Sequence, residues 1–353
     1  MRRSLEHAVW DSKSTIRDML LLPLLVLSFL FRFGTAARRW LYLRGVLNAY
    51  TPSCPCISVG NLTVGGTGKT PMVIHLCTLL KGKKIAVVAR GYASGGSGIR
   101  IVSDGRSVLM GPDVCGDEPY LIASTVPGTI VAVGEKKSDV VRFVEQHYHP
   151  EVIVLDDGFS HLRVARDIDL VLIDGDKGFG NGHLLPAGPL REPPAALRFA
   201  DVIGIKGRED TTIETLLRRH AGTTGTFHFT YRVRAVKSLD SDQPVPAEQL
   251  RNKTIVALAG IAFPDSFFKL LGSLGIQPAH SVAKTDHHTY GEHELASLTR
   301  RYAPDAVIIT AKDAVKMKGL RRDSAVAWLY VDIAVEEDSG VLSGLLRSKG
   351  LLP

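Results

Sequence analysis

One short segment combines glycines, a lysine and a threonine in an order that binds phosphate. Residues 64–70 read VGGTGKT. Glycines let the backbone approach phosphate oxygens closely, while the lysine suits the β- and γ-phosphates and the hydroxyl that follows it suits Mg²⁺. An apolar strand before this segment and an apolar helix after it are the context of a P-loop. We expect ATP to be bound by Gly65, Gly66, Thr67, Gly68, Lys69 and Thr70.

The segment departs from the usual G-x-x-x-x-G-K-[ST] pattern at one position, where Thr63 replaces the first glycine. A glycine-rich turn that binds nothing is the alternative interpretation. The order of strand, glycine loop and helix favours phosphate binding, because the N–H groups and the dipole at the start of a helix both attract an anion. A P-loop alone does not distinguish a kinase from a GTPase or a motor.

Two pairs of carboxylates are candidate functional residues. Asp156 and Asp157 follow the buried strand expected over residues 151–155. A carboxylate at the carboxyl end of a buried strand, beside a P-loop, is where a magnesium-associated acid belongs. Asp117 and Glu118 open an expected helix, where they could instead only cap the helix and complement its dipole.

Histidines and one arginine complete the set of candidate residues. His287 and His288 titrate near neutral pH and would suit a proton relay, although ordinary loop histidines are the alternative. A metal site at this pair lacks a third ligand at suitable spacing. Arg191 lies in a glycine- and proline-rich loop, residues 175–201, and would suit a phosphate clamp.

The elements that position these residues alternate along the chain. Strands alternating with helices predict an α/β fold: a P-loop NTPase-like, mostly parallel sheet with helices on both faces over residues 46–227. A second, smaller α/β domain is expected over residues 228–353. Two alternating strands, near residues 224–239 and 328–335, would pair and form a hinge between the domains.

The amino-terminal segment is apolar between residues 19 and 31, with arginines and lysines on both sides and tryptophans nearby. As a helix the run would span about 20 Å, which is short of the ~30 Å hydrocarbon core of a bilayer. A buried core helix and a cleaved signal peptide are the alternatives. We expect residues 1–45 to form a membrane-associated helical segment, with the catalytic body at the cytoplasmic face of the inner membrane.

Composition narrows the choice of partners. The 353 residues carry a net charge of +7, which suits an anionic membrane surface or a phosphorylated substrate. No nucleic-acid-binding motif is present in the sequence, so no nucleic-acid partner is expected. The four cysteines lack the spacing of a zinc site, and we interpret them as reduced thiols.

Several longer stretches resemble one family, the tetraacyldisaccharide 4′-kinases, which act in lipid A biosynthesis. The resemblance covers residues 40–335 and the amino-terminal segment. The stretches that carry it are SVGNLTVGGTGKTP, ARGY, GDEPYLIA, VLDDGFSH, LLPAGPLREP, AGIAFPDSFF, TDHHTY and TAKDAVKM. Thr63 also fits this family. The resemblance implies transfer of the ATP γ-phosphate to the 4′-hydroxyl of a tetraacylated disaccharide 1-phosphate in the cytoplasmic leaflet.

The resemblance also implies roles for individual residues. Asp117 would be the catalytic base, paired with His287 or with its neighbour His288. Lys69 would keep its P-loop role and Arg191 would contact phosphate oxygens. The acidic group around Mg²⁺ and the substrate would be Glu118, Asp156 and Asp157, together with the hydroxyl of Thr70.

Some positions depart from the family. FSH stands where a phenylalanine–glutamine–histidine run is frequent, and AKD stands where a glutamate often precedes the lysine. Lys136 and Lys137 stand near a position that often holds arginine, and lysine lacks the bidentate fork. The alternative function is a membrane-attached P-loop ATPase switch of the partition or transport type. Such proteins usually carry a lysine before the paired glycines, where this chain has Val64. A GTPase is disfavoured because the chain lacks a guanine-specific N-K-x-D motif.

Overall fold

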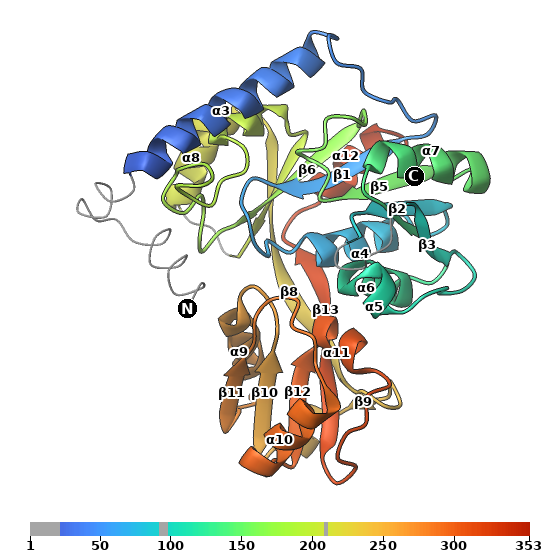
Figure 1. Ribbon diagram of the computed structural model, residues 1–353, viewed down its shortest axis with the longest axis vertical. Helices are drawn as coiled ribbons and strands as arrows, with labels where there is room; N and C mark the ends of the chain where they lie inside the picture. Colours follow the sequence, from blue (N-terminus) through green and yellow to red (C-terminus); the bar gives the residue numbers. More distant parts are fainter. Residues whose placement is uncertain (1–21, 92–97, 208–210) are drawn as a thin grey trace.

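Figure 1 shows the computed structural model, which describes residues 22–91, 98–207 and 211–353. Several residues of the expected membrane segment lie outside this range: Arg2, Arg3, Trp10, Lys13, Arg17 and the start of the apolar run at Met19. Tyr92, in the glycine-rich loop that follows the second strand, also lies outside it.

The strands form one continuous sheet in the order β11-β10-β12-β13-β8-β7-β6-β1-β5-β2-β4-β3, with β9 beside β8. The strands on the β3 side, together with helices α4 to α8 and α12, make up the first lobe. Its strands are β1 (Cys56–Asn61), β2 (Ile85–Ala89), β3 (Arg100–Asp104), β4 (Ile130–Val133), β5 (Val152–Asp156), β6 (Ile168–Asp174), β7 (Val202–Lys206) and β8 (Gly225–Ser238). Its helices are α4 (Lys69–Leu79), α5 (Pro112–Cys115), α6 (Asp117–Thr125), α7 (Lys137–Tyr148), the 3-10 helix η1 (Pro194–Phe199), α8 (Thr211–Ala221) and α12 (Val341–Ser348).

Apart from helix α3 (Leu22–Leu43), the remaining elements form the second lobe, drawn below the first in Figure 1. Its strands are β9 (Pro244–Val245), β10 (Ile255–Ala259), β11 (His280–Ala283), β12 (Ala306–Thr310) and β13 (Ala327–Glu337). Its helices are the 3-10 helix η2 (Ala247–Leu250), α9 (Pro264–Ser273), α10 (Glu292–Tyr302) and α11 (Ala311–Met317).

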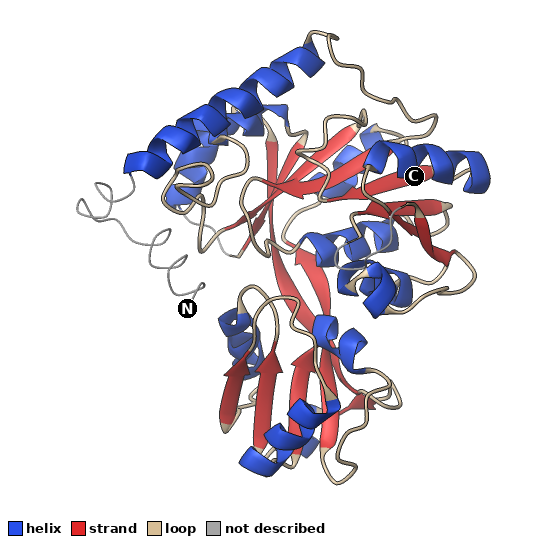
Figure 2. Cartoon of the chain, in the orientation of Figure 1, coloured by secondary structure: helices blue, strands red, loops and turns tan. Residues whose placement is uncertain are grey.

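Helices cover both faces of the sheet, as the alternation of elements predicts (Figure 2). In the first lobe, α4, α6 and α12 bury their apolar residues on one face, and α7, η1 and α8 bury theirs on the other. In the second lobe, α9 packs on one face and α10 with α11 on the opposite one. The central strands of the first lobe are buried along their whole length, which suits a parallel sheet covered on both sides.

Parallel pairing brings the functional ends of the strands together. β1 pairs in parallel with both β5 and β6, and Val59 lies opposite Asp156. The segments that follow β1 and β5 therefore leave the sheet at the same edge, as the carboxyl ends of parallel strands do. One begins the P-loop and the other contains Asp157.

Two long strands cross from one lobe to the other. β8 pairs in parallel with β7 through its first half and antiparallel with β13 from Phe229 to Ser238, with an irregularity between Asp332 and Ile333. The expected boundary at residue 228 thus falls inside β8. The expected second domain also needs one correction: α12 returns to the first lobe, where Leu342 and Leu346 join the core beneath α4. Apolar burial on that face decides the position of this helix.

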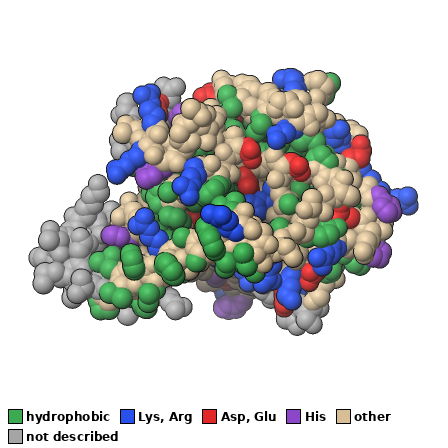
Figure 3. Space-filling model, turned by 90° about the horizontal axis from the view of Figure 1, so that it is seen from above, with side chains coloured by type: hydrophobic (Ala, Val, Ile, Leu, Met, Phe, Trp, Pro, Cys, Tyr) green, Lys and Arg blue, Asp and Glu red, His purple; other side chains and the backbone are tan. Residues whose placement is uncertain are grey.

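Helix α3 (Leu22–Leu43) lies across the first lobe beside α8 (Figure 1). Ser28 and Arg39 are its buried polar residues, and at 3.6 residues per turn they lie about three turns apart on one face. The outer face is apolar, and Phe29 and Phe33 are 69% and 71% exposed. Figure 3 looks onto this side of the molecule, where hydrophobic side chains gather between lysines and arginines. Within the described part of the chain, no helix has the length and apolar character needed to cross a membrane.

Candidate active site

The glycine loop between β1 and α4 has the shape of a phosphate cradle. Gly65 and Gly68 adopt φ angles of 104° and 89°, which L-residues with a side chain rarely adopt. α4 begins at Lys69, and Gly68 at its amino end offers no side chain to cap the first N–H groups. These donors face the cavity between the lobes, and with the helix dipole they suit an anionic ligand.

A first cluster of charges lies beside this loop, entirely within the first lobe. Arg191 donates two hydrogen bonds of 2.8 Å to the carboxylate of Asp157 and one to Asn61. Lys69 lies with its Nζ 3.2 Å from Asn61 Oδ1 and 3.7 Å from Asp157 Oδ1. Burial opposes ionisation of Asp157, but the hydrogen bonds from Arg191 and the charge of Lys69 hold its pKa well below the usual range. We call these four residues the phosphate cluster.

Behind the phosphate cluster, a buried lysine supports the end of β5. Lys137 is 3% exposed and donates to the backbone carbonyls of Asp156 and Asp157. Burial lowers the pKa of Lys137 to about 8, against the attraction of the two aspartates. The carboxylate of Asp156 is also buried, and burial with the charge of Glu118 raises its pKa. Lys137 therefore fixes the backbone of Asp156 and Asp157, and with it the positions of their carboxylates.

A second cluster joins the two lobes. His287, in the loop after β11, donates from Nδ1 to both oxygens of Asp117 at 3.0 and 3.1 Å. Burial opposes ionisation of Asp117, but the hydrogen bond from His287 and the charge of Lys312 together lower the pKa of Asp117. The same bond raises the pKa of His287. His288 turns away, with its Nε2 2.9 Å from Glu294, so the residue that contacts Asp117 is His287.

Lys312, at the start of α11, lies at the centre of this cross-lobe cluster. Its Nζ donates to Glu118 at 2.9 Å and to Asp286 at 3.3 Å, and lies 3.8 Å from Asp117. Burial acts against its charge, but Glu118 and Asp117 raise the pKa of Lys312. Lys316, one turn further along α11, lies 3.9 Å from Asp117 and 3.0 Å from the buried Asp313. We call Asp117, Glu118, Asp286, His287 and Lys312 the cross-lobe cluster.

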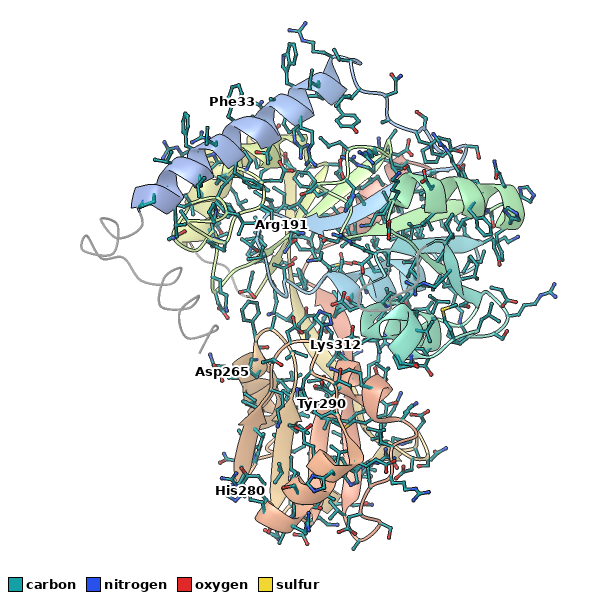
Figure 4. The ribbon with its side chains drawn as sticks, in the orientation of Figure 1. Phe33, Arg191, Asp265, His280, Tyr290 and Lys312 are labelled. Carbon is teal, nitrogen blue, oxygen red and sulfur yellow. The ribbon has the colours of Figure 1, made fainter. Side chains whose placement is uncertain are left out.

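Sequence reasoning did not single out Asn61, Asp286 or Lys312 for a role, and it named Lys137 only because it stands near a position that often holds arginine in the family that the sequence resembles. The available signal was the spacing of Lys312 and Lys316, which places both lysines on one face of an expected helix. Figure 4 shows that Arg191 and Lys312 belong to different lobes, and both line the cavity between the lobes.

Residues of both clusters line one cavity of about 1200 Å³ between the lobes. Residues of the second lobe approach the P-loop directly, since a side chain at Gly65 would meet the ring of Phe263. The cavity is large enough for a nucleotide and part of a second substrate. Of the residues expected from the sequence, those that line it are Gly65, Gly66, Thr67, Gly68, Lys69, Thr70, Glu118, Asp156, Asp157, Arg191 and His287. Asp117 lies behind His287 and is 7% exposed.

The fit of the site to Mg²⁺ depends on few protein ligands. Among the residues that the structure describes, no group of three or more His, Cys, Asp and Glu side chains is placed to hold a metal ion. Mg²⁺ bound with a nucleotide needs only one or two carboxylates, because phosphates and water supply the rest. Asp156 fits this role, since its buried Oδ1 lacks a hydrogen-bond partner among the described atoms.

The chain is similar to known proteins over almost its whole length. Residues 18–350 match the family described as tetraacyldisaccharide-1-P 4′-kinase. A tetraacyldisaccharide 4′-kinase of Syntrophus aciditrophicus is 39% identical over 338 residues, covering 89% of each chain. One from Pelobacter propionicus is 38% identical over 351 residues, covering 96% of this chain and 95% of that protein.

One solved structure is similar over almost the whole chain. It is an "apo" form of LpxK from Aquifex aeolicus in complex with ATP. It covers 94% of this chain and 98% of its own, with a TM-score of 0.74 and 28% sequence identity. The fold predicted from the sequence, with both lobes of α/β structure, is therefore shared with that protein.

Proposed function

Because this chain belongs to the tetraacyldisaccharide-1-P 4′-kinase family, we propose that it transfers the γ-phosphate of ATP to the 4′-hydroxyl of a tetraacylated disaccharide 1-phosphate at the cytoplasmic face of the inner membrane. Membership makes the chain a kinase of lipid A biosynthesis that uses ATP with Mg²⁺. The substrate detail, the location and the residue roles given below are our proposals.

One observation carries the assignment of roles: His287, which is hydrogen-bonded to Asp117, lines the same cavity as the P-loop lysine, Lys69. A phosphoryl transfer to an alcohol needs a cradle for the triphosphate and a proton acceptor on the opposite side of the reacting phosphorus. The phosphate cluster supplies the first requirement and the cross-lobe cluster supplies the second.

The proposed step breaks one bond and forms one. The 4′-oxygen bonds to the γ-phosphorus while the bond from that phosphorus to the β,γ-bridging oxygen breaks, and ADP leaves. The hydroxyl proton passes to the Asp117–His287 pair. The lowered pKa of Asp117 keeps it ionised, and the raised pKa of His287 lets the pair take the proton as a unit.

Three cations surround the position of the transferring phosphoryl group. Lys69 and Arg191 approach from the phosphate cluster, and Lys312 approaches from the second lobe. Fixed cations stabilise the charge that spreads over the phosphoryl oxygens in the transition state. Mg²⁺ neutralises charge on the β- and γ-phosphates when it is bound, and Thr70 and Asp156 fit best as its protein ligands. Glu118 and Asp157, also expected at the metal, are held here by Lys312 and Arg191.

We also propose that β8 and β13 act as the hinge between the two lobes, so that closing the lobes assembles the cross-lobe cluster over both substrates. The apolar outer face of α3 would rest on the membrane surface, with its arginines near anionic headgroups. This arrangement would bring the cavity to a lipid acceptor whose acyl chains stay in the bilayer.

The test is an assay of the purified full chain in detergent with γ-labelled ATP, Mg²⁺ and a tetraacylated disaccharide 1-phosphate, resolved by thin-layer chromatography. We expect the label to move to the lipid, and to do so with Lys318→Met but not with Lys69→Met. Hydrolysis of ATP without labelled lipid would instead support the ATPase switch.

A further inference from the structure

Arg39 is the one arginine among residues 22–43 that is buried, at 7% exposure, although it lies on a helix whose outer face is apolar. Its guanidinium lies 4.9 Å from the ring centroid of Phe159 and 5.0 Å from that of Phe199. One of its nitrogens lies 3.4 Å from the carboxylate of Glu192, which is itself 1% exposed. Burial lowers the pKa of Arg39 against the attraction of Glu192.

Two of these partners are close in sequence to the phosphate cluster. Glu192 directly follows Arg191, and Phe159 lies two residues after Asp157. Arg191 and Asp157 are the residues that form the bidentate pair beside the P-loop. Arg39 therefore contacts both chain segments that carry this pair, from the side opposite the cavity.

Neither segment has room to shift independently of its neighbours. Phe159 packs directly against Gly60, where any side chain would overlap it. The backbone N–H of Arg191 donates to Leu62 O at 2.6 Å, and Gly158 donates to Val59 O at 3.0 Å. The contacts made by Arg39 are thus transmitted to β1 and the start of the P-loop through packed atoms.

We propose that Arg39 is a positioning residue of the active site: from α3 it fixes Glu192 and Phe159, and through them the placement of Arg191 for the γ-phosphate. This inference rests on the proposed function, because it assumes that Arg191 contacts the γ-phosphate of ATP. It makes α3 a part of the phosphate site as well as a membrane contact.

The neighbouring Arg38 does not replace Arg39. Arg38 also reaches Glu192, at 3.3 Å, but its side chain is 45% exposed. Loss of Arg39 would leave a buried carboxylate with one solvent-exposed partner and a gap between two rings. Removing one member of a buried charge pair disturbs the other strongly, because the remaining charge is left without compensation.

The experiment measures dissociation constants for ATP and ADP by calorimetry on the full chain in detergent. These constants do not depend on the fraction of protein that is active, so partial unfolding does not mimic the effect. The variants are Arg39→Met, the conservative Arg39→Lys, and Arg191→Met as the reference for a lost γ-phosphate contact. Arg32→Met is the matched control, because it removes the same charge from an exposed position on the same helix.

We expect Arg39→Met to weaken ATP binding by about 10-fold and ADP binding by less than about 2-fold, a coupling within the range seen for contacting residues. Arg191→Met should show the same pattern more strongly, Arg39→Lys a smaller effect, and Arg32→Met none. The deciding quantity is the ratio of the dissociation constants for ATP and ADP. If Arg191→Met changes this ratio but Arg39→Met gives the same ratio as Arg32→Met, our inference is wrong and the proposed function stands. An unchanged ratio in Arg191→Met would overturn the assigned role of Arg191 and this inference with it.

If Arg39→Met cannot be purified folded, the decision rests on Arg39→Lys, which keeps the charge and loses the planar fork. A ratio in Arg39→Lys equal to that of the wild type and of Arg32→Met would then count against the positioning role.

Discussion

The phosphate cluster and the cross-lobe cluster face each other across one cavity but are built in different ways. Every member of the phosphate cluster comes from the first lobe, and backbone pairing between β1 and β5 brings Asn61 and Asp157 to the same edge of the sheet. The cross-lobe cluster draws Asp117 and Glu118 from α6 and the other residues from loops and helices of the second lobe. The first cluster is fixed by the fold of one lobe, while the second exists only at one arrangement of the two lobes.

We propose that this difference lets ATP bind before the groups needed for the reaction are assembled. In the proposed closure of the lobes, the triphosphate would meet its cradle in the first lobe, and the proton acceptor and the third cation would be complete only when the lobes meet. Such an arrangement would limit the loss of ATP to water, because the catalytic groups would come together after the substrates are enclosed.

The largest effect should come from the phosphate cluster. Lys69→Ala removes the ammonium that the loop amides cannot replace, and we expect turnover to fall by about 10³-fold with the fold intact. Steady-state kinetics and a thermal melt measure both quantities. Near-normal turnover in this variant would contradict the phosphate role of the loop.

Breaking the pair across the lobes should have the next largest effect. We expect Asp117→Ala and His287→Ala each to lower turnover by about 10²-fold, the scale of general-base catalysis. ATP affinity should change little, because the phosphate cluster remains. The double variant should be hardly slower than the worse single variant, since the two residues act as a unit. Multiplicative losses would show that they act separately.

A lysine comparison within the second lobe tests lobe closure. Lys312→Met leaves Glu118 and Asp286 without their shared cation, so we expect about 10-fold lower turnover and a more open protein by small-angle scattering. Lys318→Met is the control, because Lys318 instead pairs with Asp242 at 2.9 Å on the protein surface. Equal behaviour of the two variants would remove Lys312 from the site.

The smallest effect should be a titration. The hydrogen bond to Asp117 raises the pKa of His287. The contribution of the pair to the free energy of unfolding is therefore complete below the ordinary histidine pKa of about 6.5, and it is lost as the pH rises through the raised pKa. The lowered pKa of Asp117 keeps the pair intact down to about pH 4. NMR titration should show a lower pKa for His287 in Asp117→Asn than in the wild type. An unchanged value would mean that the hydrogen bond is absent in solution.

The sequence predicted the phosphate cluster better than the cross-lobe cluster for a physical reason. The P-loop and the Asp156–Asp157 turn are local patterns at strand ends, and parallel pairing brings strand ends together without further information. His287 and His288 are neighbours with the same chemistry, so only the folded loop shows which one contacts Asp117. Lys312 was not assigned a role because two of its partners, Asp117 and Glu118, lie in another lobe and far away in the chain.

The packing of helices α3 and α12 could not be predicted from local sequence patterns either. α12 is an ordinary amphipathic helix, and its return to the first lobe depends on which apolar surface is left uncovered. Arg39 stands in a basic stretch that predicts solvent or headgroup contact, but its guanidinium fits between two rings that come from distant segments. Pairing of this kind is decided by tertiary contacts alone.

The unbroken sheet has a mechanical meaning for the movement of the lobes. β8 and β13 run through both lobes as a ribbon of paired backbone, so the lobes cannot swing as bodies on a slack tether. We expect a change in their angle to bend and twist this ribbon, most readily at the irregularity between Asp332 and Ile333, where the register of the pairing shifts. The two paired strands would then act as an elastic hinge with one preferred angle between the lobes. Its stiffness, set by the residues of the two strands, would tune how readily the protein releases its product.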